Sequence, residues 1–444
     1  MGIKVGMVSL GCPKNQVDAE MMLATLKGAN FEITADPGLA DVVVVNTCGF
    51  IESAKAESIE NILEFCGLKK EGRIKCVVVT GCLAERYRDQ VGQEIPEADV
   101  VLSIGRNQDI ARVILEAMAK DEPVYAFGDK YSLPLEGERM LSTPPYMAYL
   151  KIAEGCDNRC TYCAIPMIRG GFRSRRMEDV LAEAKNLAGQ GVREVVLIAQ
   201  DTSRYGEDLY GESLLPILLE ELAKIQEFRW IRMLYCYPER ITDALLDTIA
   251  DHGNIAKYLD IPLQHCNGRI LKLMNRHGDK KTLLALLQKI RGRIPGITLR
   301  TSLIAGFPSE TDEEFEELCQ FVKEAKFDRL GCFAYSAEED TPAARLPGQL
   351  DEALKQRRAE LVMELQYEVN LGQAERKIGR TIPVVVEGYD RYAECFFGRS
   401  EADAPEIDFK VFFTSGHPLS LGEMVMVRIG DQLDLDLTGE VVLE

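Results

Sequence analysis

Several features that mark other classes of protein are missing from this sequence. Its 444 residues contain no run of eighteen apolar residues and no charged-then-apolar leader, so we expect neither a membrane span nor a secretory signal. The number of cysteines is odd, at thirteen, which fits poorly with a scaffold of disulfides. We therefore expect a cytoplasmic protein with reduced thiols, long enough for two or three domains.

The sequence also contains fewer basic than acidic residues. Lys and Arg number 52 against 71 Asp and Glu, which gives a net charge of −19. This sign disfavours a non-specific grip on a nucleic-acid backbone. It suits a basic protein partner, because opposite fields steer an encounter. Solubility alone is the alternative explanation of the excess acid.

The most informative stretch is the loop 155–166, which reads Gly-Cys-Asp-Asn-Arg-Cys-Thr-Tyr-Cys-Ala-Ile-Pro. The spacing of Cys156, Cys160 and Cys163 lets one loop supply three corners of a cubane iron–sulfur cluster. Such a cluster normally takes four thiolates, so one iron would stay open for chemistry. Residues 146–152 alternate like a strand, which places the loop at a strand's carboxyl end. A zinc site or unrelated buried thiols are the alternatives, but no second Cys or Cys/His pair follows within thirty residues.

Three more cysteines each follow a short apolar run near the N-terminus. Cys12, Cys48 and Cys82 lie 36 and 34 residues apart, an interval that holds one strand, one helix and two turns. A βαβ series forms a parallel sheet whose strands end at one edge, where open α/β sheets bind ligands. The pattern predicts a second three-cysteine cluster site. The alternative is burial as small apolar residues, which we expect for Cys66 and Cys76.

The remainder of the chain predicts a barrel followed by a small β domain. Apolar runs alternate with helical stretches between residues 146 and 372, which indicates a partial parallel (β/α)6 barrel, and residues 350–379 predict a long amphipathic helix that closes it. Short β-branched runs from residue 381 onward predict a small antiparallel barrel. The predicted barrel strands are 146–152, 194–199, 230–236, 258–261, 298–304 and 329–333. The chain is thus α/β and multidomain, with an N-terminal domain at 1–120, a Pro-containing linker at 121–141, the barrel at 142–373 and the β domain at 376–444.

Polar residues at the predicted strand ends are weaker candidates for a site, because a loop glutamine or histidine is more often a local hydrogen-bonder than a catalyst. Arg300 is the best of them, since a fixed guanidinium suits the carboxylate of a cofactor or of an aspartate substrate. The others are Gln200, Asp201, Gln264, His265, Gly306, Phe307 and Pro308. A run of arginines beside the cysteine loop could hold carboxylates, face RNA or form a solvated turn. It consists of Arg169, Arg173, Arg175 and Arg176.

The cysteine loop, with Tyr162 before its last cysteine, resembles the signature of radical S-adenosylmethionine (SAM) enzymes, and the stretch 149–170 resembles their methylthiotransferase branch. The resemblance implies a radical-SAM barrel and a loop that holds a 4Fe–4S cluster. The open iron would bind SAM, whose cleavage gives a 5′-deoxyadenosyl radical. We assign catalysis to Cys156, Cys160, Cys163 and Arg300, and cofactor binding to Tyr162, Gln200, Gln264, Arg300 and Gly306.

The N-terminal motifs extend this resemblance. The segments 11–15, 46–48 and 80–82 are similar to the methylthiotransferase N-terminal domain. In that domain three cysteines hold an auxiliary 4Fe–4S cluster, so the implied metal ligands are Cys12, Cys48, Cys82, Cys156, Cys160 and Cys163. In the implied mechanism, one SAM gives its methyl group to a sulfide on the auxiliary cluster. A second SAM supplies the radical, with an electron from a flavodoxin- or ferredoxin-like reductant.

Within this family, the segments 11–15, 332–336 with 341–343, and 404–408 resemble the RimO branch. That branch adds a methylthio group to the β-carbon of an aspartate in the basic small-subunit ribosomal protein S twelve. The branch typified by MiaB, which acts on C2 of adenosine in tRNA, more often carries Gly-Cys-Gln-Met-Asn at the first segment. We predict a RimO-type transferase, with a MiaB-type transferase and a non-catalytic iron–sulfur carrier as alternatives. Ala19 and Phe409 depart from the branch pattern.

The C-terminal β domain resembles the TRAM module by its position, but it is acidic. An RNA-gripping barrel would carry the opposite charge, and a negative barrel would attract a basic protein and repel tRNA. We expect this role for the loop carboxylates Glu401, Asp403, Glu406 and Asp408.

Overall fold

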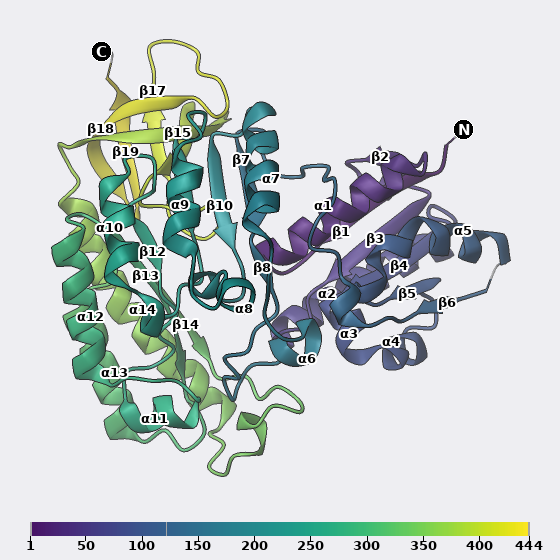
Figure 1. Cartoon of the computed structure of the whole chain (residues 1–444), viewed down its shortest axis with the longest axis horizontal. Coiled ribbons are helices and arrows are strands. Elements are labelled where there is room, and N and C mark those ends of the chain that lie inside the picture. Colours follow the sequence, from purple (N-terminus) through teal and green to yellow (C-terminus); the bar gives the residue numbers. More distant parts are fainter. Residues whose placement is uncertain (1, 121, 443–444) are drawn as a thin grey trace.

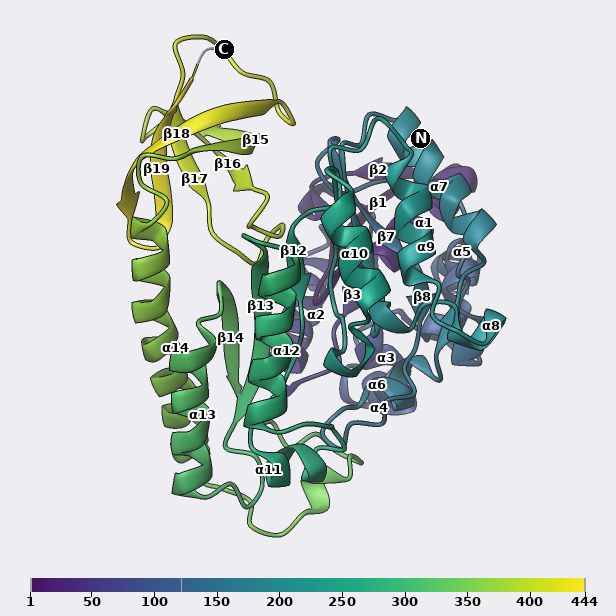
Figure 2. The ribbon, with the colours of Figure 1, turned by 60° about the vertical axis from the view of Figure 1, so that its left-hand side comes forward.

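The computed structural model describes residues 2–120 and 122–442. Three units follow one another along the chain, and the C-terminal one packs beside the central one rather than apart from it (Figures 1 and 2). The first residue of the predicted linker, Asp121, lies outside the described residues. So do Met1 and the last two residues of the predicted β domain, Leu443 and Glu444.

The N-terminal unit is a six-stranded parallel sheet in the order β2-β1-β3-β4-β5-β6. Its strands are β1 (Lys4–Ser9), β2 (Glu32–Thr34), β3 (Val42–Thr47), β4 (Cys76–Gly81), β5 (Val100–Leu102) and β6 (Val124–Ala126). Its helices are α1 (Pro13–Gly28), α2 (Glu52–Lys70), α3 (Cys82–Tyr87), α4 (Asp89–Glu94) and α5 (Ile110–Lys120). The open parallel sheet is confirmed, but its sixth strand lies within the stretch 121–141 that we predicted as a linker.

Every residue of β3 and β4 is buried. Because side chains alternate along a strand, Val42 and Val44 join one core cluster with α1 and α5, while Val43 and Val45 join another with α2. Helices therefore cover both faces, as strands that are apolar on both sides require. β1, β3 and β4 run parallel, so the three cysteines that follow them are delivered to one edge of the sheet.

The central unit is a partial barrel made of two three-stranded parallel sheets, β11-β10-β7 and β12-β13-β14. A parallel bridge between Ile231 and Ile255 connects their edges. The strands are β7 (Met147–Lys151), β10 (Glu194–Ile198), β11 (Trp230–Met233), β12 (Tyr258–Asp260), β13 (Thr298–Ala305) and β14 (Arg329–Ala334). Each begins within one residue of its predicted start.

Helices pack on the outside of this barrel between successive strands (Figure 2). They are α7 (Met177–Gly189), α9 (Leu215–Ala223), α10 (Asp243–Asp251), α12 (Lys280–Arg293) and α13 (Asp312–Ala325). Shorter elements shape the loops, namely the hairpin of β8 (Ala153–Glu154) and β9 (Arg173–Ser174) and the helices α6 (Ile165–Arg169), α8 (Glu207–Tyr210) and α11 (Gly268–Leu273). The predicted closing helix is α14 (Glu352–Glu375), which packs along β14. No helix in the described part of the chain is long and apolar enough to span a membrane.

The C-terminal unit is a closed five-stranded barrel in the order β15-β16-β17-β19-β18. Its strands are β15 (Thr381–Asp390), β16 (Cys395–Ser400), β17 (Val411–Thr414), β18 (Met424–Leu433) and β19 (Asp436–Val441). The pairings are antiparallel except that β17 runs parallel to β19, which closes the barrel.

The long loop 401–409 of this barrel packs against the first residues of the central strands, which corrects one prediction. We expected its carboxylates to face a partner, but Glu401 accepts from the Lys257 amide at 2.7 Å, and Asp403 forms an ion pair with buried Arg329. Asp408 accepts from the Tyr258 hydroxyl at 2.6 Å. The central barrel carries buried arginines that need counter-charges, and this loop supplies them.

Candidate active site

The three N-terminal cysteines occupy three neighbouring loops at the end of the sheet. Cys12 precedes α1, Cys48 follows β3, and Cys82 opens α3. Glycine permits the close approach, because a Cβ on Gly11 would lie 2.8 Å from the Cβ of Cys48. Burial raises the pKa of the Cys82 thiol to about 12, and the neighbouring thiols Cys12 and Cys48 also act to raise it. The three loops therefore lie together at one edge of the sheet, and their binding of a cluster stays a prediction.

Asn15 and Asn46 hold these loops together. The Asn15 amide donates to the carbonyls of Leu10 at 2.8 Å and Thr47 at 3.1 Å, and the Asn46 amide returns a bond to the Asn15 carbonyl at 2.7 Å. Both asparagines are buried, so the bonds are shielded from water. They fix the loop of Cys12 against the loop of Cys48.

The loop 155–166, which carries Cys156, Cys160 and Cys163 and is called the second cysteine loop below, follows β7 and β8. Backbone contacts hold it in place. Gly155 has φ +74°, and a Cβ there would lie 2.1 Å from the Gly171 carbonyl oxygen. The Cys156 amide donates to Gly170, and the Thr161 hydroxyl donates to the Leu273 carbonyl at 2.7 Å. Burial raises the pKa of the Cys156 thiol to about 11, and a metal that binds this sulfur would replace its proton.

Both trios fit an iron–sulfur cluster better than a single ion. Within residues 2–120 and 122–442, no three His, Cys, Asp or Glu side chains converge closely enough to hold one metal ion, so the zinc alternative gains no support. A cubane cluster takes each thiolate on a separate iron, so its three ligands need not converge on one point. Sulfur donors without carboxylates are also the set that such clusters prefer.

Residues that the sequence did not mark surround the second loop. The Tyr237 hydroxyl lies 3.6 Å from Cys160 Sγ, and the buried Arg276 guanidinium lies 4.0 Å from the same sulfur and 4.1 Å from the Tyr237 ring. Hydrogen bonds and positive charge near a cluster sulfur are known means of tuning its potential. Tyr237 lies 77 residues from Cys160 and Arg276 lies 116, so no local pattern announces either contact.

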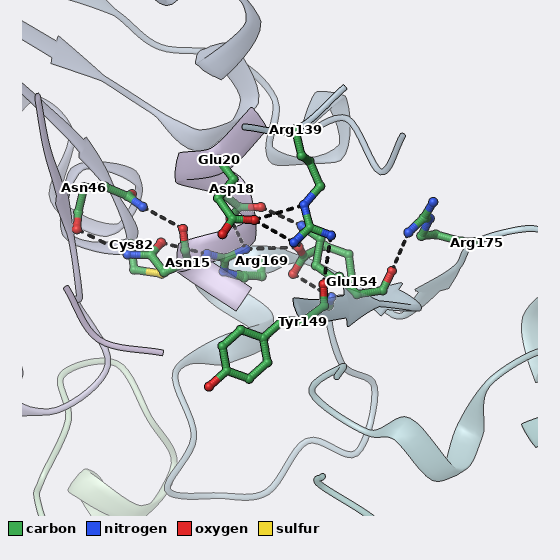
Figure 3. A network of polar contacts seen from close by, with 12 residues as sticks. Asn15, Asp18, Glu20, Asn46, Cys82, Arg139, Tyr149, Glu154, Arg169 and Arg175 are labelled. Atoms are coloured by element: carbon green, nitrogen blue, oxygen red, sulfur yellow. Dashed lines mark hydrogen bonds and ion pairs between the residues drawn. The ribbon is translucent and has the colours of Figure 1, made fainter. Parts of the chain in front are cut away.

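Arg169 joins the two cysteine loops through a buried polar network (Figure 3). It ends α6, just after the second loop, and is 1% exposed. Its guanidinium donates to Cys82 Sγ at 3.5 Å, Asn15 Oδ1 at 3.1 Å, Asp18 Oδ2 at 2.7 Å and Glu154 Oε2 at 3.0 Å. The alternatives that we kept for Arg169, a solvated turn or an RNA-facing patch, are therefore wrong.

The same network includes Lys151 and one predicted cofactor residue. Lys151 forms ion pairs with Asp18 and Glu154, the latter at 3.0 Å, and Gln200 donates to Glu154 at 2.9 Å. Lys151, Asp18 and Glu154 are all at most 2% exposed. Opposite charges thus compensate one another across the contact between the N-terminal unit and the barrel.

The remaining predicted residues lie at different distances from the cysteine loops. Tyr162 is part of the loop 155–166, and burial, with Cys160 close by, raises the pKa of its hydroxyl. Gln264 adopts a left-handed φ of 71° after β12, and Gly306 follows β13 with its amide bound to Glu310 at 3.0 Å. Both sit at strand ends, as predicted, and their contact with a cofactor stays a prediction.

Arg300 requires a correction. We expected Arg300 at a strand end, facing the carboxylate of a cofactor or of an aspartate substrate. Instead it lies near the start of β13 and forms an ion pair with Asp260 at 2.8 Å, with Asp408 of the loop 401–409 at 3.8 Å. Its charge is already compensated inside the chain. The placement argues against the catalytic and cofactor-binding roles that we gave it and indicates a role in packing the C-terminal barrel.

Comparisons with known proteins agree with this architecture. Residues 4–103 match the Uncharacterized protein family UPF0004, residues 150–322 the Radical SAM superfamily and residues 378–442 the TRAM domain. A solved radical SAM methyltransferase, TsrM from Kitasatospora setae, is similar with a TM-score of 0.56 over 77% of each chain, at 13% identity. The fold and the cysteine loop therefore define a radical SAM protein.

Relatives that span the whole chain narrow the class. The ribosomal protein uS12 methylthiotransferase RimO of Desulforamulus reducens is 52% identical over 98% of this chain and 99% of its own length. That of Pelotomaculum thermopropionicum is 50% identical over the full length of both. The chain belongs to the RimO family of radical SAM methylthiotransferases.

Proposed function

We propose that this protein is a transferase that adds a methylthio group to the β-carbon of an aspartate in ribosomal protein uS12. What supports the proposal most is the contact that Arg169, just after the three-cysteine loop 155–166, makes with Cys82 of the N-terminal trio, in a chain related to RimO over its whole length. A MiaB-type activity on tRNA is not favoured, because these full-length relatives are uS12 methylthiotransferases.

The two loops divide the work in this proposal. Cys156, Cys160 and Cys163 would hold one 4Fe–4S cluster, the one that binds SAM, and Cys12, Cys48 and Cys82 would hold the auxiliary cluster. With SAM bound, the cluster at Cys156, Cys160 and Cys163 would supply radical chemistry able to take a hydrogen from an unactivated C–H bond, which no ordinary acid or base achieves.

The residues around the loops have defined tasks in this proposal. Tyr237 and Arg276 cover Cys160 and keep water from that sulfur, and Arg169 places a fixed cation against Cys82. The network of Lys151, Asp18 and Glu154 sets the distance between the loops. A buried and fully compensated network resists rearrangement, so the sulfur donor and the radical source keep one relative position.

We further propose a cytoplasmic location, where ribosomal proteins are available, and an external flavodoxin- or ferredoxin-like reductant. The net charge of −19 favours association with a basic ribosomal protein. Because most carboxylates of the loop 401–409 are used inside the chain, this attraction depends on the remaining acidic surface.

Mass spectrometry tests the function by comparing the parent strain, a strain that lacks the gene, and the same deletion strain with the wild-type gene restored. We expect uS12 to lose one methylthio group in the deletion strain and to regain it with the wild-type gene, while methylthiolated tRNA nucleosides stay unchanged. Unmodified uS12 in the parent strain, or loss of the tRNA modification, would refute the proposal.

A further inference from the structure

A cavity of about 330 Å³ opens beside the loop that carries Cys12. β1, α1, Ser142 and the tip of the loop 401–409 form its walls. Cys12 and Glu406 both belong to its lining, and among the described residues Glu406 is the one lining residue that carries a formal charge. The volume is in the range of sites that hold small ligands or single side chains.

The C-terminal barrel presents Glu406 to this cavity on a rigid loop. On one side of it, Asp403 is anchored by Arg329. On the other side, Asp408 is anchored by the Tyr258 hydroxyl and by the Ala404 amide at 2.8 Å. Between these anchors Glu406 adopts φ 67°, a left-handed conformation that non-glycine residues seldom take. Such a conformation persists where the surroundings enforce it.

Glu406 differs from Asp403 and Asp408 of the same loop in having no cationic partner. Among the described residues its side chain has one hydrogen bond, from the neutral Tyr149 hydroxyl at 3.4 Å, and no ion pair. Its residue is exposed, whereas Asp403 is buried. The other carboxylates of the loop bind residues of the central barrel, whereas the carboxylate of Glu406 lines the cavity next to Cys12.

We propose that Glu406 selects the protein substrate by binding a cationic side chain, lysine or arginine, that neighbours the aspartate to be modified. The inference rests on the proposed function. The target carboxylate itself would be repelled by Glu406, so the ion pair must come from a neighbouring residue, and it orients the target away from the cavity wall. The same carboxylate repels a nucleic-acid phosphate, which gives the site a repulsive as well as an attractive element.

Steady-state kinetics on recombinant uS12 test this inference. We compare Glu406→Gln with the matched control Asp431→Asn, which removes an exposed carboxylate from β18 of the same barrel, where it binds only the adjacent Gln432 amide. We expect the amide at 406 to raise KM for uS12 roughly tenfold, the effect of one charge-assisted hydrogen bond, with kcat within about twofold. Asp431→Asn should match the wild type.

A charge exchange makes the test specific. Each Lys or Arg near the modified aspartate of uS12 is replaced in turn by Glu, and each variant is offered to wild-type enzyme and to Glu406→Lys. We expect one uS12 variant to be a poor substrate for the wild type and to be restored by Glu406→Lys. An unchanged KM for Glu406→Gln, an equal effect of Asp431→Asn or the absence of any restored pair would overturn the inference alone. A wild-type enzyme that leaves uS12 unmodified would overturn the proposed function and the inference together.

Discussion

At the scale of single residues, Arg169 connects the loop 155–166 with the N-terminal cysteine loops. Its one guanidinium contacts a sulfur, an amide oxygen and two carboxylates, all within the protein interior. A planar group with five donors suits this arrangement, and a lysine ammonium could not reach all four partners. The residue was visible in the sequence only as one of four arginines, because its partners lie up to 154 positions away.

Replacing Arg169 by Met should destabilise the protein strongly. Asp18 and Glu154 would keep Lys151 as their one nearby cation, and breaking a buried ionic contact costs about 3–5 kcal/mol. Denaturant unfolding of the metal-free protein measures this change. The matched control is Arg176→Met, an exposed member of the same arginine run, which should stay within about 0.5 kcal/mol of the wild type. Equal stabilities of the two variants would contradict the account.

At the scale of elements, the sequence predicted the strands well and their long-range partners poorly. β7 and β10 to β14 were found because apolar runs bounded by turn residues mark buried strands. The meeting of Cys12, Cys48 and Cys82 followed from the geometry of parallel strands. The pairing of Asp403 with Arg329, 74 positions apart, and that of Arg300 with Asp260 had no local signature. The sequence therefore predicted where the cysteine loops lie, but not the residues that hold these loops together.

The second cysteine loop should depend on Gly155. Alanine there would place a Cβ 2.1 Å from the Gly171 carbonyl oxygen, at a φ of +74°, so the loop must change shape. We expect Gly155→Ala to lose the barrel cluster and keep the N-terminal one after anaerobic reconstitution. Iron and sulfide assays measure this loss, and electron paramagnetic resonance identifies the surviving cluster.

The control for this variant is Gly189→Ala, at the end of α7, where an added Cβ meets nothing within 4 Å. This substitution should leave both clusters in place. A Gly155→Ala protein with a full complement of iron would show that the loop tolerates another conformation.

At the scale of the whole molecule, ion pairs fasten the C-terminal barrel to the central one. Glu194 of β10 binds Arg399 at 2.7 Å and Arg232 at 2.9 Å, and all three residues are buried. Burial alone would raise the pKa of Glu194, but the charges of Arg399 and Arg232 outweigh it and hold the pKa below its usual value. The carboxylate is therefore ionised at neutral pH and stabilises the contact.

This contact should weaken in acid. A lowered pKa gives stability that is complete above the unfolded value of about 4.3 and is lost as the pH falls toward the folded value. At pH 7 we expect Glu194→Gln to lower the free energy of unfolding by about 3 kcal/mol, and the difference from wild type should shrink below about pH 4. Urea unfolding across this range measures it. Glu440→Gln, an exposed change on β19, is the control, and a pH-independent difference for Glu194→Gln would contradict the assignment.

The central claim is that two cysteine trios hold two separate clusters with separate tasks. Iron and sulfide analysis, combined with an assay of 5′-deoxyadenosine formation, tests it on two triple alanine variants, one for each trio. We predict about eight iron atoms per wild-type chain and about four in each variant. The variant without Cys12, Cys48 and Cys82 should still cleave SAM but transfer no methylthio group, and the variant without Cys156, Cys160 and Cys163 should do neither. Loss of both clusters in either variant, or SAM cleavage without the second trio, would contradict the account.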